Sequence, residues 1–398
     1  MKLSNDCIMV NNEFEKVIFI YNRRTHIKYN INCEMFNLIK DIHNNKINYG
    51  NAILNYDKVI IDELLIKQIL TKKKEKYIPN IKYPNKLNTA RIFIEITDKC
   101  NLNCSHCYGG FARKNKNFIN IDDINKIINE AINLEIYEFD ITGGEPLLYP
   151  ELEQLLRKLY DSGMLVSIFT NLTVFNEKHL DIFKKYCVKK VITSIDSCYK
   201  EIHDNFRGNK GCFEKTMNSI EKLKTSSIEL SINTMIGSHN IKYIDQMIAF
   251  LQGLKLPFVL DVITNEGRAL SLNEDAKASS NAIKTILEKY DTYINEDMNF
   301  KYCGIGERFI YIKSDGNIYI CPSLIYDEYK IGNIYNNFNL YKIWYKMEKM
   351  FGNLSCSYKN EKCKKCKGGC RARALKHYGD ISAVDDIYCT IIKGDVDV

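Results

Sequence analysis

Hydrophobic and polar positions follow two patterns in turn between residues 91 and about 263. Short apolar runs predict strands, and the stretches between them, with apolar residues every three or four positions, predict amphipathic helices. The predicted strands read RIFIEIT, YEFDIT, LVSIFT, KVITSI, IELSINTMI and PFVLDVI, and helices are expected near 121–134, 150–162, 176–186, 212–224 and 240–253.

Strands that alternate with helices indicate βα units and a parallel sheet. Six such strands suit a partial barrel or an open sheet, so we predict an α/β fold for residues 91–295. Active sites of these folds lie at the carboxyl ends of the strands.

The pattern before residue 91 is different and predicts a small separate domain at residues 1–75. KVIFIYN and THIKYNI alternate like two strands of a hairpin joined at residues 22–24. A helix is expected after Asn32, which is a suitable N-cap, and a second helix near Asp62. A hairpin with helices is a winged-helix-like arrangement. Residues 76–90 are polar, contain two prolines and are predicted to be a linker.

The βα pattern stops at about residue 296, and residues 296–398 are predicted to form a third, cysteine-rich domain. ERFIYIKSDGNIYICPS predicts a hairpin that turns at Asp315 and Gly316.

Composition narrows the class of protein. Hydrophobic residues make up 45% and charged residues 26% of the 398 positions, which is typical of a globular protein. The net charge of +7 is spread along the chain; its densest run, at residues 72–76, is expected to be a solvated hinge or else a contact with nucleic acid or an acidic peptide. No apolar run approaches the ~20 residues of a membrane span, and no signal peptide is evident, so we expect a cytoplasmic protein without membrane or nucleic-acid partners. Fifteen cysteines in that compartment indicate metal binding rather than disulfides.

The stretch DKCNLNCSHCYGG places three cysteines, Cys100, Cys104 and Cys107, directly after the first strand of the predicted barrel. Three thiolates can hold three irons of a [4Fe–4S] cluster and leave the fourth iron open, whereas a cluster that only transfers electrons normally has four. A zinc knuckle with a remote fourth ligand is the alternative.

The C-x3-C-x2-C spacing, with Tyr108 after it, resembles the radical S-adenosylmethionine (SAM) superfamily. The resemblance implies a partial (β/α)6 barrel, a [4Fe–4S] cluster and SAM bound to its open iron. It also implies a 5'-deoxyadenosyl radical that abstracts hydrogen from the substrate. In such an enzyme the cofactor supplies the difficult chemistry, and the protein positions it.

Further motifs follow the other strands in the order that this resemblance implies. The segment ITGGEPLL corresponds to the part of the family that binds the SAM amino group, and polar residues at later strand ends correspond to ribose, carboxylate and adenine contacts. A glycine-rich turn and helix-capping residues are the structural alternatives. The SAM contacts implied in this way are Gly143, Gly144, Glu145, Asn171, Ser194, Asp196, Arg207 and Arg268. The sequence does not identify a catalytic acid or base.

The C-terminal cysteines resemble the SPASM extension, which carries auxiliary iron–sulfur clusters, although the order of their spacings departs from the family pattern. The resemblance implies one or two auxiliary [4Fe–4S] clusters, and a zinc ribbon is the alternative. We expect one cluster on Cys303, Cys321 and Cys370, and another on Cys356, Cys363, Cys366 and Cys389.

The N-terminal unit resembles, mainly in HIKYNINCEMFNLIKDI, the PqqD-like domain that recognises leader peptides. Its hairpin edge is expected to accept a peptide strand, with Arg23, Arg24 and Lys28 near acidic leader residues. A purely structural appendage is the alternative.

The combined order of units resembles peptide maturases that install thioether or carbon–carbon crosslinks in a ribosomally made precursor peptide. We favour a thioether and expect a reductant such as flavodoxin or ferredoxin. The alternatives are a maturase that activates a protein partner, such as a sulfatase or an amine dehydrogenase, and a metal-binding winged-helix regulator.

Overall fold

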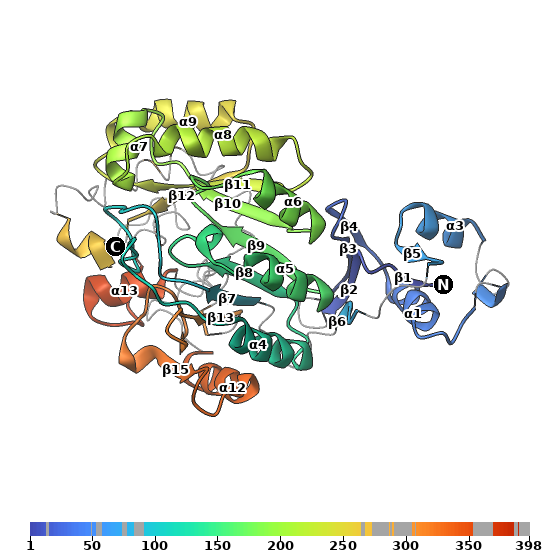
Figure 1. Cartoon of the computed structure of the whole chain (residues 1–398). Coiled ribbons are helices and arrows are strands. Elements are labelled where there is room, and N and C mark those ends of the chain that lie inside the picture. The colour runs from blue at the N-terminus through green and yellow to red at the C-terminus, as the bar shows by residue number, and fades with distance from the viewer. Residues whose placement is uncertain are drawn as a thin grey trace.

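The computed structural model describes most of the chain (Figure 1). The described residues are 1–12, 16–48, 50–52, 58–73, 78–82, 91–263, 267–272, 286, 289, 305–306, 308–352, 369–385 and 389.

The N-terminal unit is built on a sheet with the strand order β4-β3-β2-β6 within the described residues. The predicted hairpin is present, because β3 and β4 pair antiparallel, and Asn32 caps the next helix by accepting a hydrogen bond from the backbone N–H of Met35. The elements are β1 (Lys2–Leu3), β2 (Cys7–Asn12), β3 (Val17–Asn22), β4 (Ile27–Asn30), α1 (Cys33–His43), α3 (Lys58–Ile66), β5 (Leu70–Thr71) and β6 (Ile81–Lys82).

Two details differ from the sequence prediction. The second helix, α3, begins at Lys58 rather than near Asp62. The predicted linker contains strand β6, which pairs parallel to β2, while Asn80 beside it is fully buried and donates to the carbonyl oxygens of Ser4 and Cys7. A short polar segment with two prolines masked this strand, because its partner β2 is about seventy residues away in sequence.

The central sheet contains the six predicted parallel strands in sequential order, and each pairs with the next. This confirms the partial barrel. These strands are β7 (Arg91–Glu95), β8 (Glu138–Thr142), β9 (Leu165–Phe169), β10 (Lys190–Ser194), β11 (Glu229–Ile236) and β12 (Phe258–Val262).

Amphipathic helices cover the outside of this sheet (Figure 1). In α4, for example, Ile124, Ile127, Ile128 and Ala131 are buried at helical spacing against the strands. The helix α7 is absent from the sequence prediction. The helices are α4 (Ile121–Asn133), α5 (Leu152–Asp161), α6 (Glu177–Lys185), α7 (Lys200–Arg207), α8 (Cys212–Lys224) and α9 (Ile244–Gly253), with short 3-10 turns at Pro146–Leu148, Ile241–Tyr243 and Gly267–Ser271.

The C-terminal region continues the same sheet instead of forming a detached unit. Strand β13 pairs parallel to β7, and the hairpin turns at Gly316, whose φ of 81° favours glycine. Buried Glu95 of β7 accepts hydrogen bonds from the Tyr311 hydroxyl and from Ser314, which ties the hairpin to the barrel interior. The elements are β13 (Phe309–Ile312), β14 (Asn317–Tyr319), η5 (Asp327–Tyr329), β15 (Lys330–Asn333), α12 (Leu340–Phe351) and α13 (Arg371–Tyr378).

Arg23, in the turn between β3 and β4, joins the N-terminal unit to the barrel. Its side chain is fully buried, lies over the Tyr160 ring at 4.1 Å, and donates 2.9 Å to the carbonyl oxygen of Tyr160. The expectation that Arg23 meets an acidic leader is therefore wrong, because its guanidinium is already enclosed by the protein. Arg24 pairs with Asp6 at 3.0 Å, and only Lys28 of the three stays exposed without a carboxylate partner in the described part of the chain.

No helix in the described residues is long and apolar enough to cross a membrane.

Candidate cluster and cofactor site

A cavity of about 200 Å³ opens at the carboxyl ends of the barrel strands. The end of β8, the segments after β9 and β10, the loop after β7 and the Gly267–Ser271 turn all contribute to its walls. The sequence-predicted residues among its lining are Cys100, Cys104, Cys107, Gly143, Gly144, Asn171, Ser194, Arg207 and Arg268. Six separate sequence motifs thus meet around one cavity.

The three cysteines lie on a compact loop that the surrounding chain fixes on several sides. Cys100 and Cys104 are buried, and Cys107 is partly exposed. The Arg268 guanidinium donates 2.8 Å to the carbonyl oxygens of both Cys104 and Phe111, so this side chain holds the loop in shape. In the described part of the chain, no three Cys, His, Asp or Glu side chains lie close enough together to hold a single metal ion.

Gly143 and Gly144 bring the backbone after β8 against this loop. A Cβ on Gly143 would lie 2.3 Å from the carbonyl oxygen of Thr97, and a Cβ on Gly144 would lie 2.3 Å from that of Lys99. Gly143 also has a φ of 147°, which side chains rarely allow. Only glycine fits this approach, so the turn lies directly against the segment that leads into the cysteine loop.

Glu145, which the resemblance implies as a contact of the SAM amino group, is enclosed by its own neighbours. Its side chain is fully buried beside the cavity, where it accepts hydrogen bonds from the Thr170 hydroxyl and from the backbone N–H groups of Leu147 and Asn171. Burial raises the pKa of Glu145 to about 7, although these donors oppose the shift. The carboxylate therefore shapes the Asn171 segment rather than lining the cavity.

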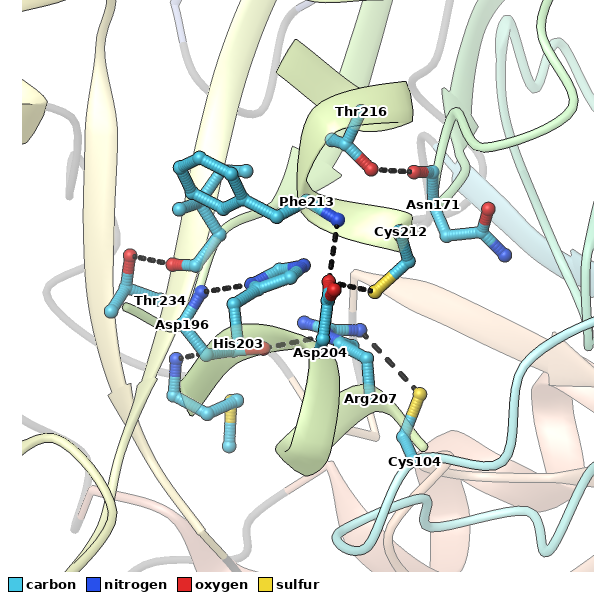
Figure 2. A network of polar contacts seen from close by, with 12 residues as sticks. Cys104, Asn171, Asp196, His203, Asp204, Arg207, Cys212, Phe213, Thr216 and Thr234 are labelled. Atoms are coloured by element: carbon cyan, nitrogen blue, oxygen red, sulfur yellow. Dashed lines mark hydrogen bonds and ion pairs between the residues drawn. The ribbon is translucent and has the colours of Figure 1, made fainter. Parts of the chain in front are cut away.

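Asp196 and Arg207 form a buried ion pair of 2.5 Å below the cavity (Figure 2). Burial opposes ionisation of Asp196, but Arg207 outweighs it and holds the pKa of that carboxyl below its usual range. Arg207 also donates to the Cys104 sulfur at 3.9 Å. Asp196, which we predicted as a ribose contact, has no exposed surface and holds Arg207 in place.

A second carboxylate, Asp204 of α7, connects this helix to the start of α8 (Figure 2). Asp204 accepts from the backbone N–H groups of Gly211 and Phe213 and from the Cys212 thiol, and so caps the start of α8. Cys212 is therefore a buried capping thiol packed beside the cysteine loop.

Sequence reasoning missed His106 and Asn233, which also line the cavity. His106 stacks on Phe206 with ring centroids 4.4 Å apart, and burial, reinforced by Arg207, lowers the pKa of this imidazole to about 3. Its position inside the C-x3-C-x2-C loop was a usable signal, whereas Asn233 lies within a strand and gave none.

Of the seven C-terminal cysteines, three are described. Cys321 follows β14 and is buried, Cys370 precedes α13, and Cys389 is buried. Asp385 connects the last two, because its carboxylate accepts from the Cys370 N–H and its carbonyl oxygen accepts from the Cys389 N–H. The predicted ligands outside the described residues are Cys303, Cys356, Cys363 and Cys366.

Comparison with known protein families defines the class. The radical SAM superfamily model matches residues 94–251, and the model for the iron–sulfur cluster-binding SPASM domain matches residues 303–367. The chain is therefore a radical SAM enzyme with a SPASM domain. A radical SAM domain binds a [4Fe–4S] cluster and SAM, and a SPASM domain binds auxiliary iron–sulfur clusters.

Several individual proteins are similar over most of the chain. The subtilosin biosynthesis protein AlbA of Bacillus subtilis is 25% identical over 310 residues, which cover 71% of this chain and 67% of AlbA. The PqqA peptide cyclase of Ruegeria pomeroyi is 24% identical over 326 residues, which cover 74% of this chain and 85% of the cyclase. The structure of Streptococcus suis SuiB bound to its precursor peptide SuiA superposes with a TM-score of 0.65 at 15% identity. The superposition covers 98% of this chain and 99% of SuiB.

The residues present fit the cluster and SAM. Three thiols meet at one cavity, and the glycine turn leaves backbone rather than side chains at its wall. The buried Arg207 supplies a cation at the same wall, next to the Cys104 sulfur.

Proposed function

We propose that this enzyme modifies a ribosomally made precursor peptide by forming a thioether or carbon–carbon crosslink. The observation that carries the proposal is the single cavity at the carboxyl ends of the strands, where three cysteines, the glycine turn and Arg207 meet. The similarity to AlbA and to the PqqA peptide cyclase supports a peptide as the substrate. These relatives favour a peptide-modifying enzyme over a protein-activating maturase or a winged-helix regulator.

The roles of the site residues follow from their positions. Cys100, Cys104 and Cys107 hold the cluster, which with SAM supplies a radical that abstracts hydrogen from the peptide. Arg207 would meet the SAM carboxylate, because this residue lines the cavity while Asp196 accepts from its Nε and fixes the side chain. Glu145 orients Asn171, whose side chain in turn contacts Asn101 in the cysteine loop at 3.0 Å.

The C-terminal cysteines keep their proposed assignment as auxiliary-cluster ligands. Cys321 and Cys370 belong to one set and Cys389 to the other. Auxiliary clusters suit an oxidative reaction, because a product radical must lose an electron. A reductant such as flavodoxin or ferredoxin supplies the first electron, and the cytoplasm is the expected location.

The N-terminal unit acts, in this proposal, as a PqqD-like leader-recognition domain. Its edge strand β4 has no further strand beside it among the described residues, so its outer backbone groups can pair with an added peptide strand.

The test is the intact mass of the short peptide encoded beside this gene after anaerobic co-expression with the enzyme. We expect the loss of two hydrogens for each crosslink, and fragmentation then locates the bond. An unchanged mass for that peptide contradicts the proposal.

A cysteine variant tests the first motif separately. Cys104→Ala removes one cluster thiol and should abolish formation of 5'-deoxyadenosine from SAM, measured by chromatography. Cys33→Ala is the matched control, because Cys33 is exposed in α1 and should leave the yield unchanged. Cys366→Ala should reduce the peptide product more than SAM cleavage; equal loss of both would indicate a structural role for the C-terminal region.

A further inference from the structure

A second cavity, of about 460 Å³, lies between the N-terminal sheet and the amino ends of the barrel strands, at the opposite end from the cysteine loop. One wall is the face of β3 and β4, and the other is formed by the residues that begin β7, β8, β9, β11 and β13. The lining residues that carry charge are Lys28, Arg91, Lys189, Arg308, Glu138 and Glu229.

Positive charge exceeds negative charge in this cavity. Among the described residues, its lining contains four lysine or arginine side chains and two glutamates. Glu138 is partly buried between Arg91 at 2.9 Å and Lys189 at 3.4 Å, so its charge is already matched. Asp140 adds a second carboxylate behind Arg91. Even with Asp140 included, cations are in the majority, and an anionic group would be attracted into the space.

Lys28 is an exposed residue of the cavity lining and can pair with an anionic group. Its ammonium lies 4.2 Å from the centroid of the Phe19 ring, and within the described part of the chain it has no carboxylate partner. In the β3–β4 ladder Lys28 is opposite Tyr21, so both side chains are on the face that looks toward the barrel.

The wall below Lys28 is rigid and polar. The Tyr21 hydroxyl donates 3.1 Å to Glu229 and lies 3.0 Å from Nδ1 of His26. His26 has a φ of 57°, a strained conformation for a residue with a side chain. The hairpin turn is thus held against the barrel by contacts that also shape the cavity.

We propose that this cavity receives an acidic side chain of the substrate peptide when the peptide adds as a strand to β4. Alternate side chains of a strand point to opposite faces, so every second residue of a peptide on β4 would face the barrel beside Lys28. An aspartate or glutamate there would meet Lys28 and the cationic lining. This inference rests on the proposed peptide substrate and adds which of its residues is recognised.

Fluorescence anisotropy with the full-length, cluster-loaded enzyme tests the proposal. The probe is the fluorescein-labelled leader half of the peptide encoded beside the gene, with a series in which each Asp or Glu is changed to Asn or Gln. Lys28→Gln should raise the Kd by about two- to fivefold, as expected for an ion pair at an exposed lysine. Lys58→Gln, at an exposed position in α3 of the same unit, is the matched control and should leave the Kd unchanged.

One peptide variant should remove the effect. For the peptide that lacks the recognised acid, Lys28→Gln should cause no further loss, so that the double change equals either single change. Protection of the Lys28 amine from acetylation by the peptide, read by mass spectrometry, should accompany binding. Protection without any peptide would mean that the chain's own segment fills the cavity, and would overturn the proposal.

The outcomes separate this inference from the proposed function. If the peptide is crosslinked but Lys28→Gln and Lys58→Gln bind it like the unchanged enzyme, the cavity proposal is wrong and the proposed function stands. If the peptide is neither bound nor modified, the proposed function fails, and the occupant named for the cavity fails with it.

Discussion

Single buried side chains decide the geometry of the cofactor site. Asp196 and Glu145 are both fully buried carboxylates beside the cavity, yet their pKa values shift in opposite directions. Asp196 has Arg207 as a full counter-charge, whereas Glu145 has only neutral donors. Ionisation of Glu145 therefore destabilises the folded state, whereas ionisation of Asp196 does not.

This difference predicts a pH effect on stability. Folding raises the pKa of Glu145 from 4.5 to about 7. Glu145 therefore has no effect on the free energy of unfolding below pH 4.5, and it lowers that free energy progressively as the pH rises toward 7. The full penalty is of the order of 3 kcal/mol. Glu145→Gln should remove this part of the pH dependence, measured by denaturant unfolding of the cluster-free chain between pH 4.5 and 7.5. Parallel pH profiles for the two proteins would contradict the assignment.

Loops at strand ends carry most of the site, and their shape depends on backbone that side chains would block. The turn after β8 passes so close to the strand end at Thr97 and to Lys99 that a methyl group has no room. The chain therefore keeps the cysteine loop and the glycine turn in one fixed relation.

Gly143→Ala tests that relation. The new Cβ must displace the backbone of Thr97, and the φ of 147° adds strain, so we expect a loss of roughly 1–3 kcal/mol in stability and a clear loss of SAM affinity in equilibrium dialysis. Gly253→Ala, at the end of α9, is the control, because no atom lies within 4 Å of its added Cβ. Equal SAM affinity in both variants would show that the close approach is not needed.

At the scale of helices and strands, the sequence predicts most of the barrel. Periodicity located the six barrel strands within one or two residues, because strands buried on both faces give continuous apolar runs. It missed α7, a short helix in which His203, Asp204, Phe206 and Arg207 are buried, so that polar and charged residues face inward where a helical pattern has apolar ones. Motif order located nine cavity-lining residues. It did not reveal that Glu145 and Asp196 are bonded inside the fold, because a motif does not show which side chains the fold uses internally.

The whole molecule is held together by pairings between distant segments that local patterns do not encode. β13 pairs with β7 across more than two hundred positions, and Arg23 reaches the carbonyl oxygens at the end of α5. Both contacts join units that the sequence presents as separate.

Arg23→Met should loosen the N-terminal unit from the barrel. The change leaves the carbonyl oxygens of Tyr160 and Met164 without their charged donor, and we expect a loss of about 2–4 kcal/mol in the stability of this junction. Faster hydrogen exchange in β2 and β3, with unchanged exchange in β8 and β9, would report it. Arg24→Met is the control; its exposed pair with Asp6 should contribute about 1 kcal/mol or less. Similar exchange in both variants would show that Arg23 is not the fastening residue.

The two cavities stand at opposite ends of the same short strands: Glu138 begins β8 at one cavity, and Thr142 ends it at the other. Five strand residues span only about 13 Å. The buried side chains of Glu95 and Tyr311 occupy the barrel interior and oppose a direct route. A peptide bound at the second cavity must pass around the outside of the barrel before it reaches the cofactor site. The enzyme would then act as a ruler, and the number of residues between the anchored acid and the target, more than the sequence around the target, would select the position that is altered.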